Sequence, residues 1–375
     1  MKTYKVSLVG TGMIMNGAHI PALQHLNGRM EVVAVCDERI EAAKFTANKL
    51  GVPYFTDCTE MLDSIESDIL INCTCNASHT PLALLGLEKR RHVITEKPVS
   101  LKVADVRKIL ETSDRTGKQF FPTQTGRFTN NSLMAKKWIQ EGQLGDVYFI
   151  DLNIIRRRGI PQWGQFHIKE KNDGGAFADM GVHNVDAVLD FCGNPLLKSA
   201  RATFYSRISK RNEEVQISNK ESGALDGTFV PRSFDMNDMS VEEFAVGTIH
   251  LERDITISFR VSWALNLPEE GTFKIVGDSG GLIMPSMHIY KTIGGCMSEV
   301  SPKVFDNTSN AVPDWGHWVC YERILDALDG RSPYPVTREQ MLNTAAILEA
   351  VYKSAALDRE VTAKEIPGLG SDVVG

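Results

Sequence analysis

The stretch VSLVGTG, residues 6–12, together with EVVAVCD at residues 31–37, decides the fold of the first part of the chain. Each is a short apolar run followed by a segment of helical length. Three further runs, DILINCT (68–74), HVITE (92–96) and KQFFP (118–122), repeat the pattern. Apolar strands that alternate with helices are typical of a parallel sheet covered on both faces. We therefore predict a doubly wound α/β domain, whose ligands bind at the carboxyl ends of the strands. Gly51 and Gly117 stand where two of the helices are expected to end.

The pattern of apolar and polar residues changes after about residue 125. From Ile255 to Trp263 every odd position is apolar and every even position is polar, which predicts a half-buried strand. VEEFAVGTIHL precedes it across a turn and predicts an antiparallel hairpin, while TFKIVG and GGLIMP predict further strands. We therefore expect two domains, residues 1–125 with the parallel sheet and its ligand site and residues 126–375 with an open, mainly antiparallel sheet. The outer face of such a sheet favours a homo-oligomer, a dimer or a tetramer. Residues 209–240 are polar and predict a long surface excursion that is functional or mobile.

The composition argues against several classes of protein. The chain of 375 residues has 41 basic and 47 acidic side chains, a formal charge of −6, so binding to nucleic acid or to an anionic membrane has no electrostatic support. The seven cysteines are scattered, and the one close pair, Cys73 and Cys75, lacks the spacing of a zinc or redox motif. We find no apolar run of the length that a signal core or a membrane span needs. We expect a cytoplasmic protein with reduced thiols and no membrane contact.

The first predicted strand ends in Gly10-Thr11-Gly12 and leads into a helix. Two glycines leave the backbone open to a pyrophosphate, whose charge the free N–H groups of a helix N-terminus can bind. Met15 occupies the third small position of this motif, so an ordinary tight turn is the alternative. Asp37 ends the second strand, where a carboxylate accepts hydrogen bonds from the adenosine ribose and repels a 2′-phosphate. We therefore predict NAD rather than NADP as the cofactor, with capping of the next helix as the alternative role of Asp37.

Lys97 follows the strand HVITE and precedes Pro98. A side chain at this edge of a parallel sheet points toward the predicted crevice, and the proline restricts the backbone beside it. The ammonium group can bind a substrate hydroxyl and stabilise the oxyanion that forms when its proton leaves. The alternative is a solvated lysine.

The stretch GGAFADMGVHNVDAVLDF, residues 174–191, carries the second candidate for acid-base chemistry. If a helix begins near Ala178, the side chains of Asp179, His183, Asp186 and Asp190 share one face. A carboxylate one turn before an imidazole provides a proton acceptor with a neighbour that orients it. The face has a single histidine, so we predict no metal site. A plain solvated helix face is the alternative.

In combination these motifs resemble the Gfo/Idh/MocA family of glucose-fructose oxidoreductases, inositol dehydrogenases and rhizopine-catabolism proteins. The resemblance spans almost the whole chain and rests on LVGTG, HIPAL at 19–23, Asp37, Asn76 with His79, Glu96-Lys97-Pro98 and the pattern Gly174, Gly175, Asp179, His183. It implies a Rossmann domain, an open sheet domain and a nicotinamide cofactor between them. The sequence departs from the family at two positions. Met15 occupies the third small position of the glycine motif, and Cys75 stands where many members have proline.

The resemblance also implies roles for individual residues. Lys97 and His183 would act on the substrate hydroxyl with support from Asp179, and which of the first two is the base stays open. Implied cofactor contacts are Gly10, Gly12, Met13, Ile14, Asp37, Thr74, Asn76, His79, Glu96 and Lys97. Implied substrate contacts are Lys97, Arg127, Arg156, Arg158, Trp163, Asp179 and His183.

The segment RRRGIPQWGQF, residues 156–166, is similar to the corresponding part of family members that oxidise carbon 3 of glucosides or anhydrosugars. Arginines can bind vicinal hydroxyls and the face of Trp163 can stack on a pyranose ring, although three arginines also fit a wet surface edge. We predict an NAD-dependent dehydrogenase that oxidises a ring hydroxyl of a sugar or glycoside, at carbon 3, to a keto sugar. Alternatives are a lyase or glycosidase with transient carbon-3 oxidation, an inositol dehydrogenase, a reductase of an unrelated carbonyl or imine, and a non-catalytic dinucleotide-sensing protein.

Overall fold

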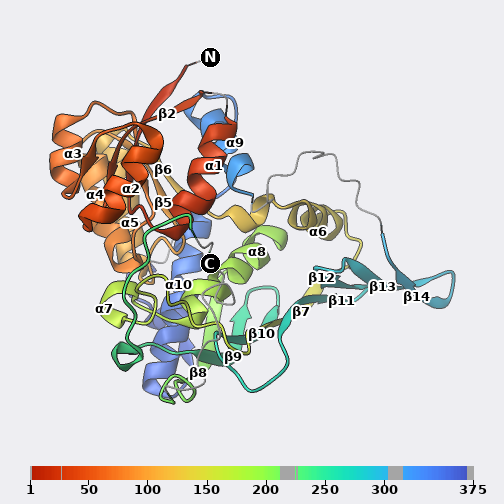
Figure 1. Cartoon of the computed structure of the whole chain (residues 1–375). Helices are drawn as coiled ribbons and strands as arrows, with labels where there is room; N and C mark the ends of the chain where they lie inside the picture. Colours follow the sequence, from red (N-terminus) through yellow and green to blue (C-terminus); the bar gives the residue numbers. More distant parts are fainter. Residues whose placement is uncertain (1, 27, 212–223, 225–226, 303–315, 370–375) are drawn as a thin grey trace.

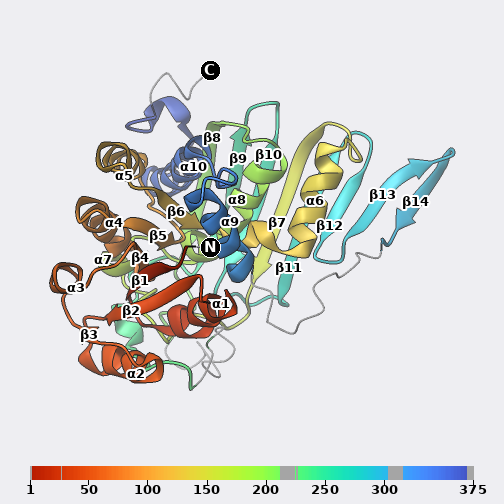
Figure 2. The same ribbon diagram turned by 90° about the horizontal axis from the view of Figure 1, so that it is seen from above.

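The computed structural model describes residues 2–26, 28–211, 224, 227–302 and 316–369. Figures 1 and 2 show two sheets joined side by side, the first covered by helices and the second extending away from it as a long, open sheet. Within the predicted excursion at 209–240, residues 212–223, 225 and 226 lie outside the described ranges. Among the described residues, no helix combines the length and the apolar character needed to cross a membrane.

The first sheet is parallel and has the strand order β3-β2-β1-β4-β5-β6. Its strands are β1 (Tyr4–Val9), β2 (Met30–Cys36), β3 (Tyr54–Phe55), β4 (Ile69–Asn72), β5 (His92–Glu96) and β6 (Phe120–Thr123). The strand order reverses at β1, which pairs with both β2 and β4, so the crevice at the carboxyl end of β1 is where such sheets bind ligands. The predicted doubly wound α/β fold is confirmed.

The helices of this half connect successive strands. They are α1 (Ile20–His25), α2 (Ile40–Leu50), α3 (Cys58–Ser64), α4 (His79–Glu88) and α5 (Val103–Thr116), with short turns η1 (Met15–His19) and η2 (Asn76–Ser78). Gly51 and Gly117 end α2 and α5 with φ of 71° and 67°, in the left-handed region where glycine is favoured. Fully buried Met15, at the third position of the glycine motif, begins the π-helical turn η1, which is wider than an α-helical turn.

The second sheet has the order β14-β13-β12-β11-β7-β10-β9-β8-β15. Its strands are β7 (Val147–Ile155), β8 (Leu197–Tyr205), β9 (Phe244–Leu251), β10 (Thr256–Ser262), β11 (Glu270–Gly277), β12 (Gly281–Met284), β13 (His288–Ile293), β14 (Cys296–Val300) and β15 (Val361–Thr362). The β7–β10 pair is parallel and the other described pairs are antiparallel, so the predicted mainly antiparallel sheet is confirmed. Ile257, Phe259 and Val261 of β10 are fully buried, as their alternation with polar residues predicts.

The remaining helices belong to the second half of the chain, and α6, α8 and α10 lie over one face of this sheet (Figure 2). They are α6 (Asn130–Gln140), α7 (Lys169–Asn172), α8 (Val182–Phe191), α9 (His317–Leu328) and α10 (Arg338–Leu357), with short turns η3 (Thr125–Phe128), η4 (Phe177–Gly181), η6 (Met236–Asp238) and η7 (Ala363–Glu365). The last two long helices confirm the helical patterns near the carboxyl end. The strands β13 and β14 form a hairpin that projects beyond the helical layer (Figures 1 and 2).

Helix α9 returns from the carboxyl-terminal part of the chain to the first half and lies beside α1 (Figure 1). Its buried residues Tyr321 and Ile324 join Ile20 and Leu23 of α1 in one apolar cluster. The helix therefore completes the core on that side of the parallel sheet. The proposed division at residue 125 stays a prediction.

Candidate active site

A cavity of about 830 Å³ lies between the two halves of the chain. Its walls come from the carboxyl ends of β1, β2, β4 and β5 on one side and from α8 and the segments around it on the other. Ten predicted cofactor contacts line it: Gly10, Gly12, Met13, Ile14, Asp37, Thr74, Asn76, His79, Glu96 and Lys97. Predicted catalytic residues from the second half, Asp179 and His183, line it as well.

The glycine loop leaves open backbone at one end of the cavity. Gly10 has φ of 82°, and a Cβ atom there would lie 2.6 Å from the carbonyl oxygen of Cys73. A Cβ atom on Gly12 would meet nothing within 4 Å, and this glycine faces the cavity directly before a helix begins. An open turn at a helix N-terminus fits a pyrophosphate group.

Asp37 connects this loop to the end of β2. Its Oδ2 atom accepts hydrogen bonds from the backbone N–H (2.9 Å) and the hydroxyl (3.2 Å) of Thr11. Its Oδ1 atom accepts from the backbone N–H of Arg39 at 3.0 Å, at the start of α2. The carboxylate therefore holds both the glycine loop and the next helix, and the ribose contact stays a prediction.

Residues 230–232, here called the strap, lie against the β2 end of the cavity. The Arg232 guanidinium forms an ion pair with Glu38 at 2.6 Å. Arg39 donates hydrogen bonds to the carbonyl oxygens of Val230 (3.0 Å) and Pro231 (3.1 Å). Hydrogen bonding from Arg232 lowers the pKa of the Glu38 carboxyl. Arg39 and Arg232 line the cavity and were not predicted from the sequence. The only signal for Arg232 was the polar stretch at 209–240, and the only signal for Arg39 was its position two residues after Asp37.

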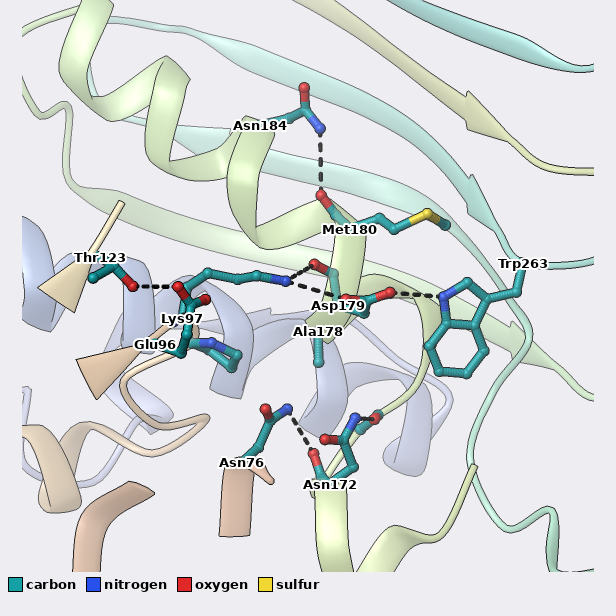
Figure 3. A network of polar contacts seen from close by, with 12 residues as sticks. Asn76, Glu96, Lys97, Thr123, Asn172, Ala178, Asp179, Met180, Asn184 and Trp263 are labelled. Atoms are coloured by element: carbon teal, nitrogen blue, oxygen red, sulfur yellow. Dashed lines mark hydrogen bonds and ion pairs between the residues drawn. The ribbon is translucent and has the colours of Figure 1, made fainter. Parts of the chain in front are cut away.

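The loop after β4 is fixed from two sides. Buried His79 bonds through its ring nitrogens to the carbonyl oxygens of Pro98 (2.8 Å) and Thr74 (3.1 Å). Asn76 donates its amide N–H to the carbonyl oxygen of Asn172 at 2.9 Å (Figure 3). The Asn76 bond joins the first half of the chain to α7 across the cavity.

Lys97, Asp179 and Trp263 form a chain of polar contacts (Figure 3). The Lys97 ammonium donates to the Asp179 carboxylate at 3.1 Å and to its backbone carbonyl oxygen at 2.9 Å. The other carboxylate oxygen accepts a hydrogen bond from the Trp263 indole N–H at 3.0 Å. Burial raises the pKa of the Asp179 carboxyl, but Lys97, Arg156 and Trp263 outweigh burial and hold that pKa below its usual value.

The segment that carries Asp179 and His183 is not one regular helix from Ala178. It begins as the π-helical turn η4 and becomes the α-helix α8 at Val182. Single π turns are frequent at functional sites. His183, in the first turn of α8, is half-buried on the cavity wall, and loss of hydration followed by the nearby Lys97 charge lowers its pKa to about 3. The imidazole is therefore neutral at physiological pH.

Glu96 is the centre of a buried cluster beside Lys97. Its Oε1 atom accepts from the Thr123 hydroxyl at 2.6 Å and bonds to His19 Nε2 at 3.0 Å, with His317 Nε2 3.8 Å away. Burial raises the pKa of the Glu96 carboxyl, but His19 and His317 outweigh it and hold that pKa well below its usual value. The ligand atoms of these three residues lie within 4.8 Å of one another, as in some metal sites. Hydrogen bonding already explains the cluster, and the absence of a metal stays a prediction.

The structure separates the predicted substrate contacts into two groups. Arg156 and Trp163 line the cavity, and the Trp163 ring lies 4.6 Å from that of Phe166, a lining residue that the sequence analysis did not single out. Arg158 is not among the lining residues and donates a hydrogen bond to Asn266 at 2.8 Å. This contact places the Arg158 side chain along the edge of the sheet, as the wet-edge alternative predicts.

Arg127 also lies away from the cavity wall. Only 2% of this residue is exposed, and its guanidinium donates to Asp186 at 2.5 and 2.6 Å and to Asp190 at 3.1 Å. The two aspartates, expected to share a face with His183, therefore serve a buried ion-pair network and not the cavity. The physical reason is that a buried guanidinium requires carboxylate partners.

Two family models match the chain. Residues 4–124 match the model described as "Oxidoreductase family, NAD-binding Rossmann fold", and residues 132–283 match "GFO/IDH/MocA C-terminal domain". D-glucoside 3-dehydrogenase of Escherichia coli (strain K12) is 27% identical over 355 residues, which cover 94% of this chain and 95% of that protein. Myo-inositol 2-dehydrogenase of Thermotoga maritima is 25% identical over 183 residues, 48% of this chain and 53% of that protein.

Solved structures share the fold over nearly the full length. The WlbA dehydrogenase from Bordetella pertussis, crystallised with NADH and UDP-GlcNAcA, has a TM-score of 0.74 and 22% identity, with 96% of this chain and 98% of that chain covered. An oxidoreductase domain protein from Kribbella flavida has a TM-score of 0.77 and 19% identity, with 98% of this chain and 100% of that chain covered.

Proposed function

The chain belongs to the Gfo/Idh/MocA family of NAD-binding oxidoreductases, and from this premise we propose that it oxidises the carbon-3 hydroxyl of a sugar or glycoside to a keto sugar. The observation that carries the proposal is the convergence of Lys97 from the first half with Asp179 and His183 from the second half on one cavity. The same cavity contains the glycine loop. Similarity to D-glucoside 3-dehydrogenase over nearly the whole chain supports the choice of substrate and of carbon 3.

The two halves of the chain bind different ligands in the cavity. Residues 1–125 bind NAD through the open turn at Gly12 and the carboxylate of Asp37, and residues 126–375 bind the sugar. The coenzyme, when bound, supplies the hydride acceptor for the carbon that is oxidised. The protein places that carbon and manages the hydroxyl proton.

The charges in the cavity favour one assignment of acid-base roles. Lys97 donates twice to Asp179, which requires hydrogens on its Nζ atom and suits an ammonium group. His183 lines the same cavity, and a neutral imidazole has one unprotonated ring nitrogen that can accept a proton. We therefore assign the hydroxyl proton to His183, while Lys97 bonds to the hydroxyl oxygen and stabilises the negative charge that develops there. Asp179 holds Lys97 in place.

We assign sugar binding to the part of the cavity wall that residues 156–166 form. The adjacent rings of Trp163 and Phe166 can stack on the apolar face of a pyranose, and Arg156 can donate hydrogen bonds to its hydroxyls. Asn172 lines the same cavity and carries a side-chain oxygen that can serve as the acceptor a polyol also needs.

The decisive experiment incubates the purified protein with NAD+ and a panel of glucosides, anhydrosugars and inositols. We expect a keto sugar two mass units lighter than one substrate, together with NADH. Mass spectrometry is needed beside absorbance because a coenzyme that stays bound gives little signal. Released aglycone without a keto sugar would instead indicate a lyase or glycosidase, oxidation of inositols alone would indicate an inositol dehydrogenase, and binding of NAD+ without turnover would indicate a sensor.

We extend the proposal to assembly and location. The sheet exposes apolar side chains at Tyr148, Tyr290, Ile293 and Met297, which suits a contact with a second copy of the chain in a dimer or tetramer. Light scattering on the purified protein tests this. All seven cysteines are free thiols, which suits the reducing cytoplasm.

A further inference from the structure

Trp263 follows β10, is fully buried and lies beside Asp179 (Figure 3). Its indole N–H donates to Asp179 Oδ2 at 3.0 Å, while Asp179 Oδ1 accepts from Lys97 at 3.1 Å. We propose that Trp263 is a positioning residue, which fixes the Asp179 carboxylate in its ionised form with one oxygen turned to Lys97. The inference rests on the proposed function, in which Lys97 bonds to the substrate hydroxyl.

In this contact the indole can only donate the hydrogen bond, and the carboxylate can only accept it. An indole N–H only donates, so it binds a carboxylate oxygen that carries no proton. The bond therefore favours the ionised form of Asp179. It also occupies Oδ2, which leaves Oδ1 and the backbone carbonyl oxygen for Lys97. Because an ammonium group has three hydrogens and two point at Asp179, the third is left for the substrate.

The backbone holds both partners through one adjacent pair of residues. The Glu242 carboxylate accepts hydrogen bonds from the backbone N–H groups of Gly175 and Phe177, both at 3.0 Å, at the start of the turn that carries Asp179. The carbonyl oxygen of Glu243 accepts from the backbone N–H of Trp263 at 2.8 Å. The turn that carries Asp179 and the backbone of Trp263 are thus held by two neighbouring residues, Glu242 through its side chain and Glu243 through its carbonyl oxygen.

The carbonyl oxygen of Trp263 is fixed as well, because it accepts from the backbone N–H of Gly159 at 2.8 Å. The backbone of Trp263 is therefore tied to the segment that follows β7 and to the one that precedes β9. Full burial of the side chain restricts the indole ring itself, so the ring has little room to follow Asp179 if the carboxylate turns. Trp263 therefore keeps the Asp179 carboxylate in one orientation, and this orientation determines where Lys97 lies.

The test replaces Trp263 with phenylalanine, which keeps an aromatic ring in the core and removes the donor. We expect kcat with the oxidised glycoside to fall about 10- to 100-fold, the scale of a small misplacement of a catalytic group, while KM changes little. Loss of the indole bond raises the pKa of Asp179, so the acid side of the pH–rate profile moves to higher pH. The matched control is Trp138→Phe in α6, a half-buried tryptophan away from the cavity. Equal kcat and equal pH profiles for the two variants would overturn the proposal.

A second measurement needs no substrate. The five tryptophans give five indole N–H resonances in a 15N-labelled sample, and the one missing from W263F belongs to Trp263. We expect this resonance to move with pH as Asp179 titrates, and to stop moving in Asp179→Asn. A Trp263 resonance that is identical in wild type and D179N at all pH values refutes the bond. If no sugar is oxidised, the proposed function fails while this readout still tests the contact.

Discussion

Replacement of Arg127 by methionine distinguishes a structural role from the substrate contact that the sequence resemblance implies. The guanidinium donates two hydrogen bonds to Asp186, at 2.5 and 2.6 Å, one to Asp190 at 3.1 Å and one to Gln340 at 2.8 Å. Asp190 keeps its ion pair with Lys136 at 2.8 Å in the variant, so Asp186 loses most. Removal of one partner from a buried ion pair costs about 3–5 kcal/mol, and we expect the free energy of unfolding to fall by that amount at pH 7.

The sign of the pH dependence follows from Asp186. Burial raises the pKa of this carboxyl even with Arg127 beside it. Without the guanidinium the folded-state pKa rises further above the unfolded value, so the folded state binds the proton more tightly. The variant therefore loses stability as the pH rises through the folded-state pKa of Asp186, and it regains stability as the pH falls. The deficit of Arg127→Met should therefore be smaller at pH 5 than at pH 7.

Urea unfolding at both pH values measures these differences, with KM for the glycoside determined in parallel. The double variant Arg127→Met/Asp186→Leu removes both charges and should recover much of the stability, because an apolar replacement of a buried pair is often tolerated. We expect KM to stay near the wild-type value. A loss of stability below about 1 kcal/mol, typical of ordinary substitutions, together with a large rise in KM would refute the structural role.

Three further outcomes are expected. Lys97→Met should retain NAD+ binding in calorimetry while kcat for keto-sugar formation falls about 10²- to 10⁴-fold, and unchanged turnover would remove the lysine from the mechanism. Because the pKa of His183 is lowered to about 3, kcat between pH 5 and 8 should show no step near pH 6.5 from this imidazole, and a step that disappears in His183→Gln would contradict its neutral state. Arg232 lines the cavity at the end where we propose that Asp37 binds the coenzyme, so loss of its ion pair with Glu38 in Arg232→Ala should loosen this wall. We expect NADH release to become about fivefold faster in stopped-flow fluorescence, as for a loss of about 1 kcal/mol, and an unaltered rate would show that the ion pair does not restrain the coenzyme.

The fold was predictable where the pattern is local. The strands of the parallel sheet are short apolar runs, and the alternation from Ile255 to Trp263 identifies β10 with its buried face. The strand β3 was not predicted because it has only two residues. The strands β13 and β14 were not predicted because an exposed hairpin needs no alternation of apolar and polar residues. The parallel pairing of β7 with β10 joins residues about 100 positions apart, and no local pattern encodes it.

The site was predictable where chemistry depends on spacing. A lysine after β5 and a carboxylate four residues before an imidazole were sufficient to name Lys97, Asp179 and His183, although their roles stay predictions. Trp263 was recognised only as an inward-facing apolar position, because its hydrogen-bond partner comes from a distant turn. The ion-pair partners of Arg127 could not be predicted for a related reason, since the carboxylates that receive a guanidinium are known only once helices are packed.

The position of β7 inside its sheet has a consequence for synthesis of the protein. Both of its neighbours, β10 and β11, are encoded after it, the nearer beginning at Thr256 while β7 ends at Ile155. At about 5–20 residues per second, a ribosome needs roughly 5–20 s to make the intervening 100 residues. During that interval the nascent chain carries an apolar strand with both edges open. We expect molecular chaperones to shield this strand, and codon changes that slow translation between the two strands to increase aggregation.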